Sequence, residues 1–305
     1  MSNLLSLADR FFRSPKPSVR LATLGLPPRP LPRSPRKPLC VVAIVKDEGK
    51  FISEWVTFYR LQGAELIVYD DSSTDQTRSI LDAYAAEGAC RVIDWDRFCI
   101  NDDLSPQMLA YAHAIVNYGD RYRWMAFLDA DEFLFSPVYD RLTDALELFA
   151  DLPALCFPWR MFGTSGIESL AAGDLVTEKF IMRGADQLKR QVKCAIDPSR
   201  VTALRDAHWF FIGDLGQMAF NEHRALVRKD NFAKTSGWEQ RLFQLNHYFT
   251  RSIEDFSEKK RKGDVAGKAH TSLERFDELQ RLIEAKPLAD RSIQRFVPTL
   301  RASLR

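Results

Sequence analysis

The chain has 305 residues, of which 46% are hydrophobic and 28% charged, as in ordinary globular proteins. A chain of this length buries a large core, which excludes a small scaffold that depends on disulfide or metal cross-links. The net charge is +2, yet residues 1–37 contain eight Lys or Arg and one Asp, so the other 268 residues sum to −5. This mildly acidic body argues against nucleic acid as a partner, because phosphate recognition needs a basic surface on the folded domain.

The cysteines and the apolar segments favour a cytoplasmic protein. The five cysteines are an odd number without a Cys-x-x-Cys pair, which argues against a disulfide framework or a zinc cluster and favours a reducing compartment. No apolar run approaches the roughly 18 residues of a membrane span. The first residues also lack the basic segment and long apolar stretch of an export signal.

Residues 1–38 are predicted to form a flexible basic arm. Eight of the fifteen prolines lie between Pro15 and Pro38, a composition that sustains neither helix nor central strand. A solvated linker is one interpretation. The alternative is peripheral contact with an acidic membrane surface at the inner membrane face, through the arginines and the apolar residues between Leu4 and Phe12.

From residue 39, strand and helix patterns alternate in the first half of the chain. Strands are predicted at 39–45, 65–70, 90–94 and 124–129, and helices at 47–63, from the turn at 71–75 to Gly88, and at 107–117. This α/β alternation predicts a mostly parallel, Rossmann-like central sheet flanked by helices. Ligands of such sheets bind beyond the carboxyl ends of the strands.

The second half of the chain has a less regular pattern. A helix is predicted at 141–152 and a strand at 155–162, and residues 160–250 mix short strands with loops. Amphipathic helices are predicted at 253–263 and 273–285. The first of these is rich in lysine and arginine, which is typical of a solvated helix face.

Acidic residues follow the strand at 124–129, in the segment Asp129-Ala-Asp-Glu. If strand geometry continues, alternation places Asp129 and Asp131 on the same side. Two adjacent carboxylates repel unless a cation lies between them, and their hard oxygens suit Mg²⁺ or Mn²⁺. The alternative is a helix N-terminus that carries acidic residues, because Asp-x-Asp alone is a weak pattern.

A second acidic group, residues 70–75, follows the strand at 65–70 on the same predicted edge of the sheet. Ser73, Thr74 or Asp75 is expected to cap the next helix. In the functional interpretation, Asp70 or Asp71 hydrogen-bonds a nucleotide base or ribose.

Five segments together resemble a known family. They are residues 42–48 (Val-Ala-Ile-Val-Lys-Asp-Glu), 67–77, 127–134 (Phe-Leu-Asp-Ala-Asp-Glu-Phe-Leu), 157–166 and 245–259. In this order they resemble the GT-A glycosyltransferases of the family-2 type, and most closely the subgroup allied with family 92. The resemblance covers residues 40 to about 263. It implies the GT-A fold of nucleotide-diphospho-sugar transferases.

The resemblance implies transfer of a sugar from a nucleotide donor, usually linked to UDP, with Mn²⁺ or Mg²⁺ as the cofactor. It implies these roles: metal ligands Asp129, Asp131 and His247, and nucleotide contacts Glu48, Asp70 and Asp129, with Asp71 as the alternative to Asp70. The basic stretch at 189–193 adds Lys193 as a candidate to neutralise the leaving diphosphate, and a solvated surface position is the alternative for it. It divides the chain into a nucleotide-sugar-binding half (39–135), an acceptor-binding half of the same domain (136–265) and a C-terminal helical segment (266–305).

The acceptor side is less defined by the sequence. Likeness to family 2 implies inversion of configuration, which requires a carboxylate base for the acceptor hydroxyl. Acidic residues of this half include Glu168, Asp197, Asp206 and Glu222, and Asp206, near His208, is the hypothesis for the base. A saccharide or glycolipid acceptor, in the synthesis of a surface polysaccharide, would suit the basic arm.

Three other functions are compatible with parts of the pattern. A metal-dependent nucleotidyltransferase also carries acids at strand ends, but no phosphate-binding loop motif and no Gly-x-Gly-x-x-Gly motif occurs in the chain. A glycosidase would explain a carboxylate pair but not the turn at 70–75. A non-catalytic carbohydrate-binding protein would use aromatic side chains to stack on sugars. The candidates for stacking are Trp159, Phe162, Trp209 and Trp238.

Overall fold

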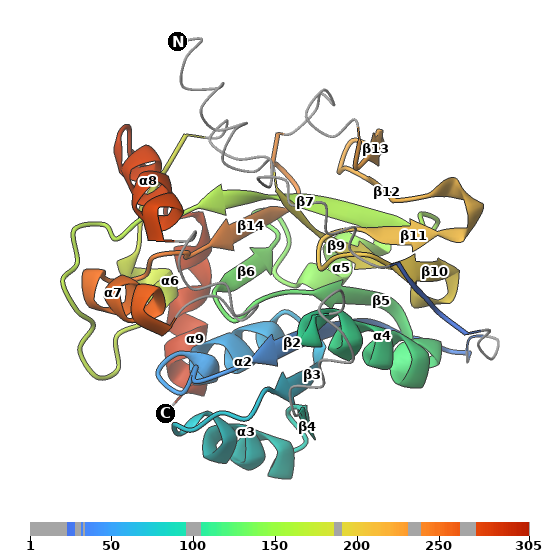
Figure 1. Ribbon diagram of the computed structural model, residues 1–305, viewed down its shortest axis with the longest axis horizontal. Helices are drawn as coiled ribbons and strands as arrows, with labels where there is room; N and C mark the ends of the chain where they lie inside the picture. The colour runs from blue at the N-terminus through green and yellow to red at the C-terminus, as the bar shows by residue number, and fades with distance from the viewer. Residues whose placement is uncertain are drawn as a thin grey trace.

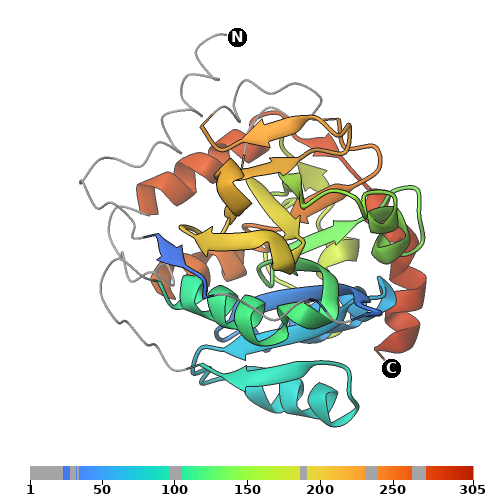
Figure 2. The ribbon, with the colours of Figure 1, turned by 90° about the vertical axis from the view of Figure 1, so that its right-hand side faces the viewer.

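The computed structural model describes residues 23–27, 32, 34–95, 105–185, 191–230, 239–262 and 273–304. Most of the predicted arm, the cysteine at position 99 and Trp238 lie outside these residues. Strands form the centre of the described part and helices cover both faces of the sheet (Figures 1 and 2).

Within the described residues, the largest sheet has ten strands. Along its main path the order is β13 (Leu226–Arg228), β12 (Met218–Phe220), β7 (Ala154–Met161), β9 (Val192–Ile196), β5 (Tyr122–Phe127), β2 (Lys37–Val45), β3 (Glu65–Asp70) and β4 (Arg91–Asp94). Two further strands, β6 (Glu132–Phe135) and β14 (Gln244–His247), join beside β7. Figures 1 and 2 both show β12 and β13 at one edge of the molecule and β4 at the other.

Most strands of this sheet point the same way. Strands β5, β2, β3 and β4 are mutually parallel, and β9 runs antiparallel to both β5 and β7. Strands β12 and β14 pair parallel with β7. The carboxyl ends of β2, β3, β5, β7 and β14 therefore meet at one edge, together with the start of β9. The predicted α/β class with a mostly parallel central sheet is confirmed.

The hydrophobic pattern of β2 explains its central position. Its side chains alternate between two cores, with Leu39, Val41 and Val45 in one and Cys40 and Val42 in the other. A strand that is apolar on both faces is stable only when both faces are covered. The first core includes α2 (Ile52–Leu61) and α9 (Val297–Ser303), and the second includes α4 (Pro106–Tyr118).

Local signals fix several helix ends. The Ser105 side chain accepts a hydrogen bond from the Met108 backbone N–H at 3.2 Å, and Pro106 occupies the first turn of α4. The other helices are α3 (Thr77–Ala86), α5 (Leu142–Glu147), α6 (Val176–Lys179), α7 (Ile253–Lys262) and α8 (Leu273–Glu284). Among the described residues, no helix has both the length and the apolar composition required to cross a bilayer.

Two sequence predictions need correction in the first half. The strand expected at 124–129 is β5 and ends at Phe127, so Asp129 and Asp131 do not continue its alternation. The helix expected at 141–152 ends at Glu147. The Arg123 guanidinium donates to the carbonyl oxygens of Ala150 and Leu152, which therefore need no helical partner.

The C-terminal part of the predicted arm is not free. Leu24–Gly25 form β1, which pairs antiparallel with β10 (Val201–Leu204), and β10 pairs with β11 (Phe210–Ile212). Arg36 binds Asp197 at 2.9 Å. Strand β1 lies at the edge of this three-stranded sheet, so it agrees with the expectation that the arm forms neither helix nor central strand. It forms because β10 offers an unpaired edge to its backbone. The remaining short strands are β8 (Met182–Arg183) and β15 (Leu288–Ala289).

Candidate functional site

The loops that follow β2 and β3 are tied together by hydrogen bonds. The Asp47 carboxylate accepts from the Thr74 backbone N–H at 2.7 Å, and the Glu48 N–H donates to the Thr77 hydroxyl at 2.7 Å. Asp75 accepts from the Thr77 backbone N–H at 2.8 Å, so it satisfies the start of α3 much as the sequence predicts. The two strand ends therefore form one connected surface.

The two aspartates predicted to contact a nucleotide, Asp70 and Asp71, lie at the end of β3 and are buried. Asp70 is 5% exposed and accepts from the Ser73 N–H at 3.3 Å, and Asp71 is fully buried. The Lys46 ammonium donates to the Asp71 carbonyl oxygen at 3.0 Å. Contact of either aspartate with a base or ribose stays a prediction.

Three non-glycine residues adopt left-handed backbone conformations just after the strand ends. Asp47, Ser72 and Arg251 have φ of 52°, 55° and 53°, after β2, β3 and β14 respectively. Each costs on the order of 1 kcal/mol relative to ordinary backbone, and such residues cluster at functional sites. The surrounding contacts therefore hold these loops in fixed shapes.

The Asp129-Ala-Asp-Glu segment is a turn stabilised from both sides. The Glu132 N–H donates to the Asp129 carbonyl at 3.0 Å, and the Glu132 carboxylate accepts from the Asp129 N–H at 2.9 Å. The Trp55 indole N–H lies 3.1 Å from the carbonyl oxygens of both residues. This turn is the physical reason that the strand does not continue through Asp131.

Asp129 lies beside a buried lysine. In the pairing of β5 with β9, Ala126 lies opposite Ala195, so Lys193 comes next to the end of β5. The Lys193 ammonium is 2.9 Å from the Asp129 carboxylate and 3.5 Å from that of Glu132. Burial alone would lower the pKa of Lys193, but the two carboxylates hold it well above its ordinary value. Lys193 is therefore a fixed positive charge at this edge.

Glu132 is a site residue that the sequence analysis did not single out. Its side chain is completely buried, and its Oε1 has no hydrogen-bond partner. Burial raises the pKa of Glu132 well above its ordinary value, although Lys193 opposes this. The sequence signal that could have identified Glu132 is its position directly after the Asp-x-Asp motif.

Asp131 has two basic neighbours that come from the C-terminal part of the chain. His247 lies opposite Glu132 in the pairing of β14 with β6, and its Nε2 is 3.4 Å from Asp131 Oδ1. The Lys259 ammonium, from α7, is 2.9 Å from Asp131 Oδ2. Burial would raise the pKa of Asp131, but Lys259 and His247 hold it well below its ordinary value.

Arg251 connects the Asp-x-Asp turn to the end of β2. Its guanidinium binds the Glu48 carboxylate at 2.8 Å, donates to the Ala130 carbonyl oxygen at 3.3 Å and lies 3.8 Å from the centre of the Phe51 ring. The structure thus brings Glu48, Asp129, Asp131, Lys193 and His247 to one edge, and their roles toward a nucleotide or a metal stay predictions. It adds Glu132, Arg251 and Lys259, which the sequence analysis had given no role.

The donor types at this edge fit Mn²⁺ or Mg²⁺. The carboxylates of Asp129 and Asp131 are hard oxygen ligands, and burial lowers the pKa of His247, which favours the neutral imidazole that binds metals. His247 Nδ1 is buried without a partner. Among the described residues, however, no three His, Cys, Asp or Glu groups converge as a ready metal site. Each of the two aspartates instead pairs with a lysine, Asp129 with Lys193 and Asp131 with Lys259.

Asp206, the predicted base, lies in the turn between β10 and β11. Its Oδ1 accepts from the backbone N–H groups of His208 and Trp209, both at 2.8 Å, and its Oδ2 pairs with Lys229. Both oxygens therefore stabilise the turn, and a role as base stays a prediction. Glu222 is similarly engaged, since it accepts from three backbone N–H groups at residues 241–243.

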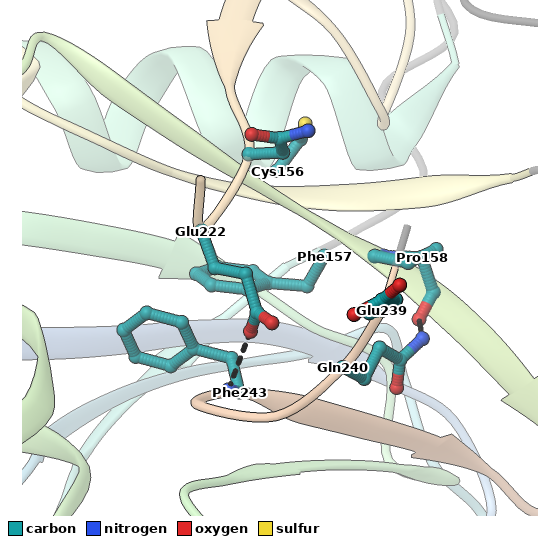
Figure 3. A pocket seen from close by; sticks show the side chains of 8 residues that line it. Cys156, Phe157, Pro158, Glu222, Glu239, Gln240 and Phe243 are labelled. Atoms are coloured by element: carbon teal, nitrogen blue, oxygen red, sulfur yellow. Dashed lines mark hydrogen bonds between the residues drawn. The ribbon is translucent and has the colours of Figure 1, made fainter. Parts of the chain in front are cut away.

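A shallow pocket lies between β7 and residues 239–243 (Figure 3). Phe157 and Phe243 form an aromatic contact there, with ring centres 5.1 Å apart, and the Gln240 side chain donates to the Pro158 carbonyl at 2.7 Å. Glu222 points toward Phe243 in this view. The pocket is therefore lined by both apolar rings and carboxylates.

Of the aromatic residues proposed to stack on sugars, only Trp159 is both described and partly accessible. Its ring lies 4.3 Å from that of His247. Phe162 and Trp209 are buried, at 0% and 3% exposure, so stacking on a ligand is excluded for them in this conformation. Trp238 lies outside the described residues.

We expect His208 to make stability depend on pH. Burial, together with the positive charge of Lys193, lowers the pKa of His208 from 6.5 to about 4. The unfolded chain therefore takes up a proton near pH 6.5 that the folded chain resists until about pH 4, so stability falls as the pH drops through this window. Urea denaturation of the wild type and His208→Gln between pH 4 and 7 measures the effect. The wild type should lose roughly 2 kcal/mol more than the variant, and parallel curves would contradict the prediction.

Side chains from separate strands thus converge beyond the carboxyl ends of a mostly parallel sheet, which is where α/β proteins bind their ligands. The sequence model of glycosyltransferase family 92 matches residues 39–263. The chain belongs to this family. The predicted likeness to a glycosyltransferase family, and to family 92 in particular, is confirmed, whereas the GT-A fold and the family-2 relationship stay predictions.

The relatives of this chain include plant proteins of the same family. A glycosyltransferase family 92 protein of Oryza sativa subsp. japonica is 24% identical over 68% of this chain, and one of Ricinus communis is 26% identical over 70%. The matches span 38% and 39% of those proteins, so this chain corresponds to about two fifths of their length.

The similar solved structures include S. aureus TarS in complex with UDP. It is 14% identical, with a TM-score of 0.35, and the match covers 79% of this chain and 69% of TarS 1–349. The complex of the same protein with UDP-GlcNAc has a TM-score of 0.33 at 13% identity, over 79% of this chain and 70% of the other. Scores this low support no inference about the donor of this chain.

Proposed function

We propose that this protein transfers a sugar from a nucleotide donor, UDP-linked, to a saccharide or glycolipid acceptor, with inversion at the anomeric carbon. The observation that carries the proposal is the convergence, in a family 92 chain, of carboxylates and cations from the ends of β2, β5 and β14, the start of β9, and α7. Asp129, Asp131 and Lys193 are its centre.

The charges at this edge suit a diphosphate leaving group. As the bond between the sugar and phosphate breaks, negative charge accumulates on the diphosphate, and fixed positive charges stabilise that state more than the ground state. Lys193, Lys259 and Arg251 supply such charges from β9, α7 and the loop after β14. A bound Mn²⁺ or Mg²⁺, held by Asp129, Asp131 and His247, would add a Lewis acid at the same diphosphate.

A calorimetric titration of UDP into the full chain, with and without Mn²⁺, tests this function. We expect binding that requires Mn²⁺ and a weaker response to the other nucleoside diphosphates. A nucleotidyltransferase would bind nucleoside triphosphates preferentially, whereas a glycosidase or a carbohydrate-binding protein would bind oligosaccharide and ignore UDP. Failure of every nucleoside diphosphate to bind with metal present would contradict the proposal.

The acceptor is proposed from sequence reasoning alone. Asp206 as the base, a cytoplasmic location and contact of the arm with an acidic membrane also stay predictions. Residues 1–22 lie outside the described part of the chain. Deletion of residues 1–37 should release the protein from vesicles that contain anionic lipid if the arm binds them.

A further inference from the structure

Lys259, which pairs with Asp131, differs in exposure and in its partners from Lys193, which pairs with Asp129. Lys193 is 1% exposed and lies near two carboxylates, Asp129 and Glu132. Lys259 is 38% exposed, and of the described carboxylates it pairs with Asp131. Both ammonium groups are 2.9 Å from their aspartate. One is therefore built into the interior, while the other reaches the site from solvent on a four-carbon stem.

Both oxygens of Asp131 are already in use. His247 Nε2 lies 3.4 Å from Oδ1, and the Lys259 ammonium lies 2.9 Å from Oδ2. A carboxylate-bound Mn²⁺ or Mg²⁺ lies roughly 2.1 Å from its oxygen and carries two positive charges. Its two positive charges would repel the Lys259 ammonium and compete with it for the Asp131 carboxylate.

We propose that Lys259 is an exchangeable cation: it neutralises Asp131 when the donor site is empty, and moves from Asp131 to the donor diphosphate when a divalent cation and the nucleotide bind. This inference rests on the proposed function, because it concerns the same donor site. In this proposal Lys259 of α7, 128 positions after Asp131 in the sequence, controls the access of metal to Asp131.

The surroundings of Lys259 support exchange. Besides Asp131, its ammonium contacts the Phe249 carbonyl oxygen at 3.1 Å and lies 4.5 Å from the centre of the Phe249 ring. These neutral contacts hold the stem near the site without a second carboxylate. Figure 1 shows α7 on the side of the sheet toward which β7 and β14 point, where a ligand beyond the strand ends would lie. The ammonium can therefore remain near the site after it leaves Asp131.

The experiment compares Lys259→Gln with a matched control, Lys179→Gln. Lys179 is 41% exposed and pairs with Asp174 at 3.0 Å, so the control removes the same charge from a similar ion pair away from the site. Binding of Mn²⁺ alone is measured on the full chain by the loss of the electron paramagnetic resonance signal of free Mn²⁺. Binding of UDP is then measured by calorimetry at saturating Mn²⁺.

We expect Lys259→Gln to bind Mn²⁺ about tenfold more tightly than the wild type without nucleotide, and to bind UDP about tenfold more weakly with Mn²⁺. Lys179→Gln should match the wild type in both measurements. If Lys259→Gln bound Mn²⁺ no more tightly than the wild type, and the wild type still bound UDP, the exchange would be overturned but the proposed function would stand. If neither the wild type nor Lys259→Gln bound Mn²⁺ or UDP, the proposed function itself would fail, and the exchange with it.

Discussion

The Asp129→Asn, Asp131→Asn double variant should lose sugar transfer by at least about 1,000-fold. Each amide keeps the size of the side chain but removes a full negative charge, and with it the hard ligand for a divalent cation. Loss of one electrostatic contact to a transition state typically lowers turnover by about 100-fold or more, and two contacts are removed here. The measurement is release of UDP from the donor sugar that binds best in the titration.

A matched carboxylate away from the site separates chemistry from general charge effects. Asp174→Asn removes an aspartate that pairs with Lys179 at 3.0 Å, and its turnover should stay within about twofold of the wild type. Circular dichroism checks that the double variant is folded. If a folded double variant kept more than a tenth of wild-type turnover, Asp129 and Asp131 would not be the centre of the site.

Lys193→Met should destabilise the protein by about 3 kcal/mol. The substitution keeps a long apolar stem but removes the cation beside Asp129 and Glu132 in a position that is 1% exposed. Removing one member of a buried ion pair leaves the other charge without compensation, which typically costs about 3–5 kcal/mol. The low end is expected because Asp129 is 36% exposed to water. Denaturation in urea measures the loss.

A second substitution tests the cause of this loss. In Lys193→Met, Asp129→Asn the uncompensated charge on Asp129 is also gone, so the double variant should be more stable than the sum of the single effects by about 1 kcal/mol. Lys259→Met should cost at most about 1 kcal/mol, because its pair with Asp131 is partly exposed. Additive effects, or a loss below 1 kcal/mol for Lys193→Met, would mean that Lys193 is not the electrostatic support of the turn.

The central strands and the acidic strand ends could be predicted from the sequence because their signals are local. An apolar run such as 39–45 specifies a strand covered on both faces, and Ser105-Pro106 specifies the start of a helix. The motif around Asp129 and Asp131 likewise belongs to one short segment. These features depend on side-chain periodicity and backbone preferences within a few residues, so they are visible in short segments of the sequence.

The tertiary structure decided which carboxylates the basic side chains of the site contact. Lys193 is 64 residues from Asp129, Lys259 is 128 from Asp131, and Arg251 is 203 from Glu48. Their contacts exist because β9 lies antiparallel between β5 and β7, and because β14 joins β7 beside β6. Strand order is set by packing of the whole chain and has no local signal. The turn at Asp129 was missed for the same reason, since it depends on Trp55, which lies 74 residues earlier.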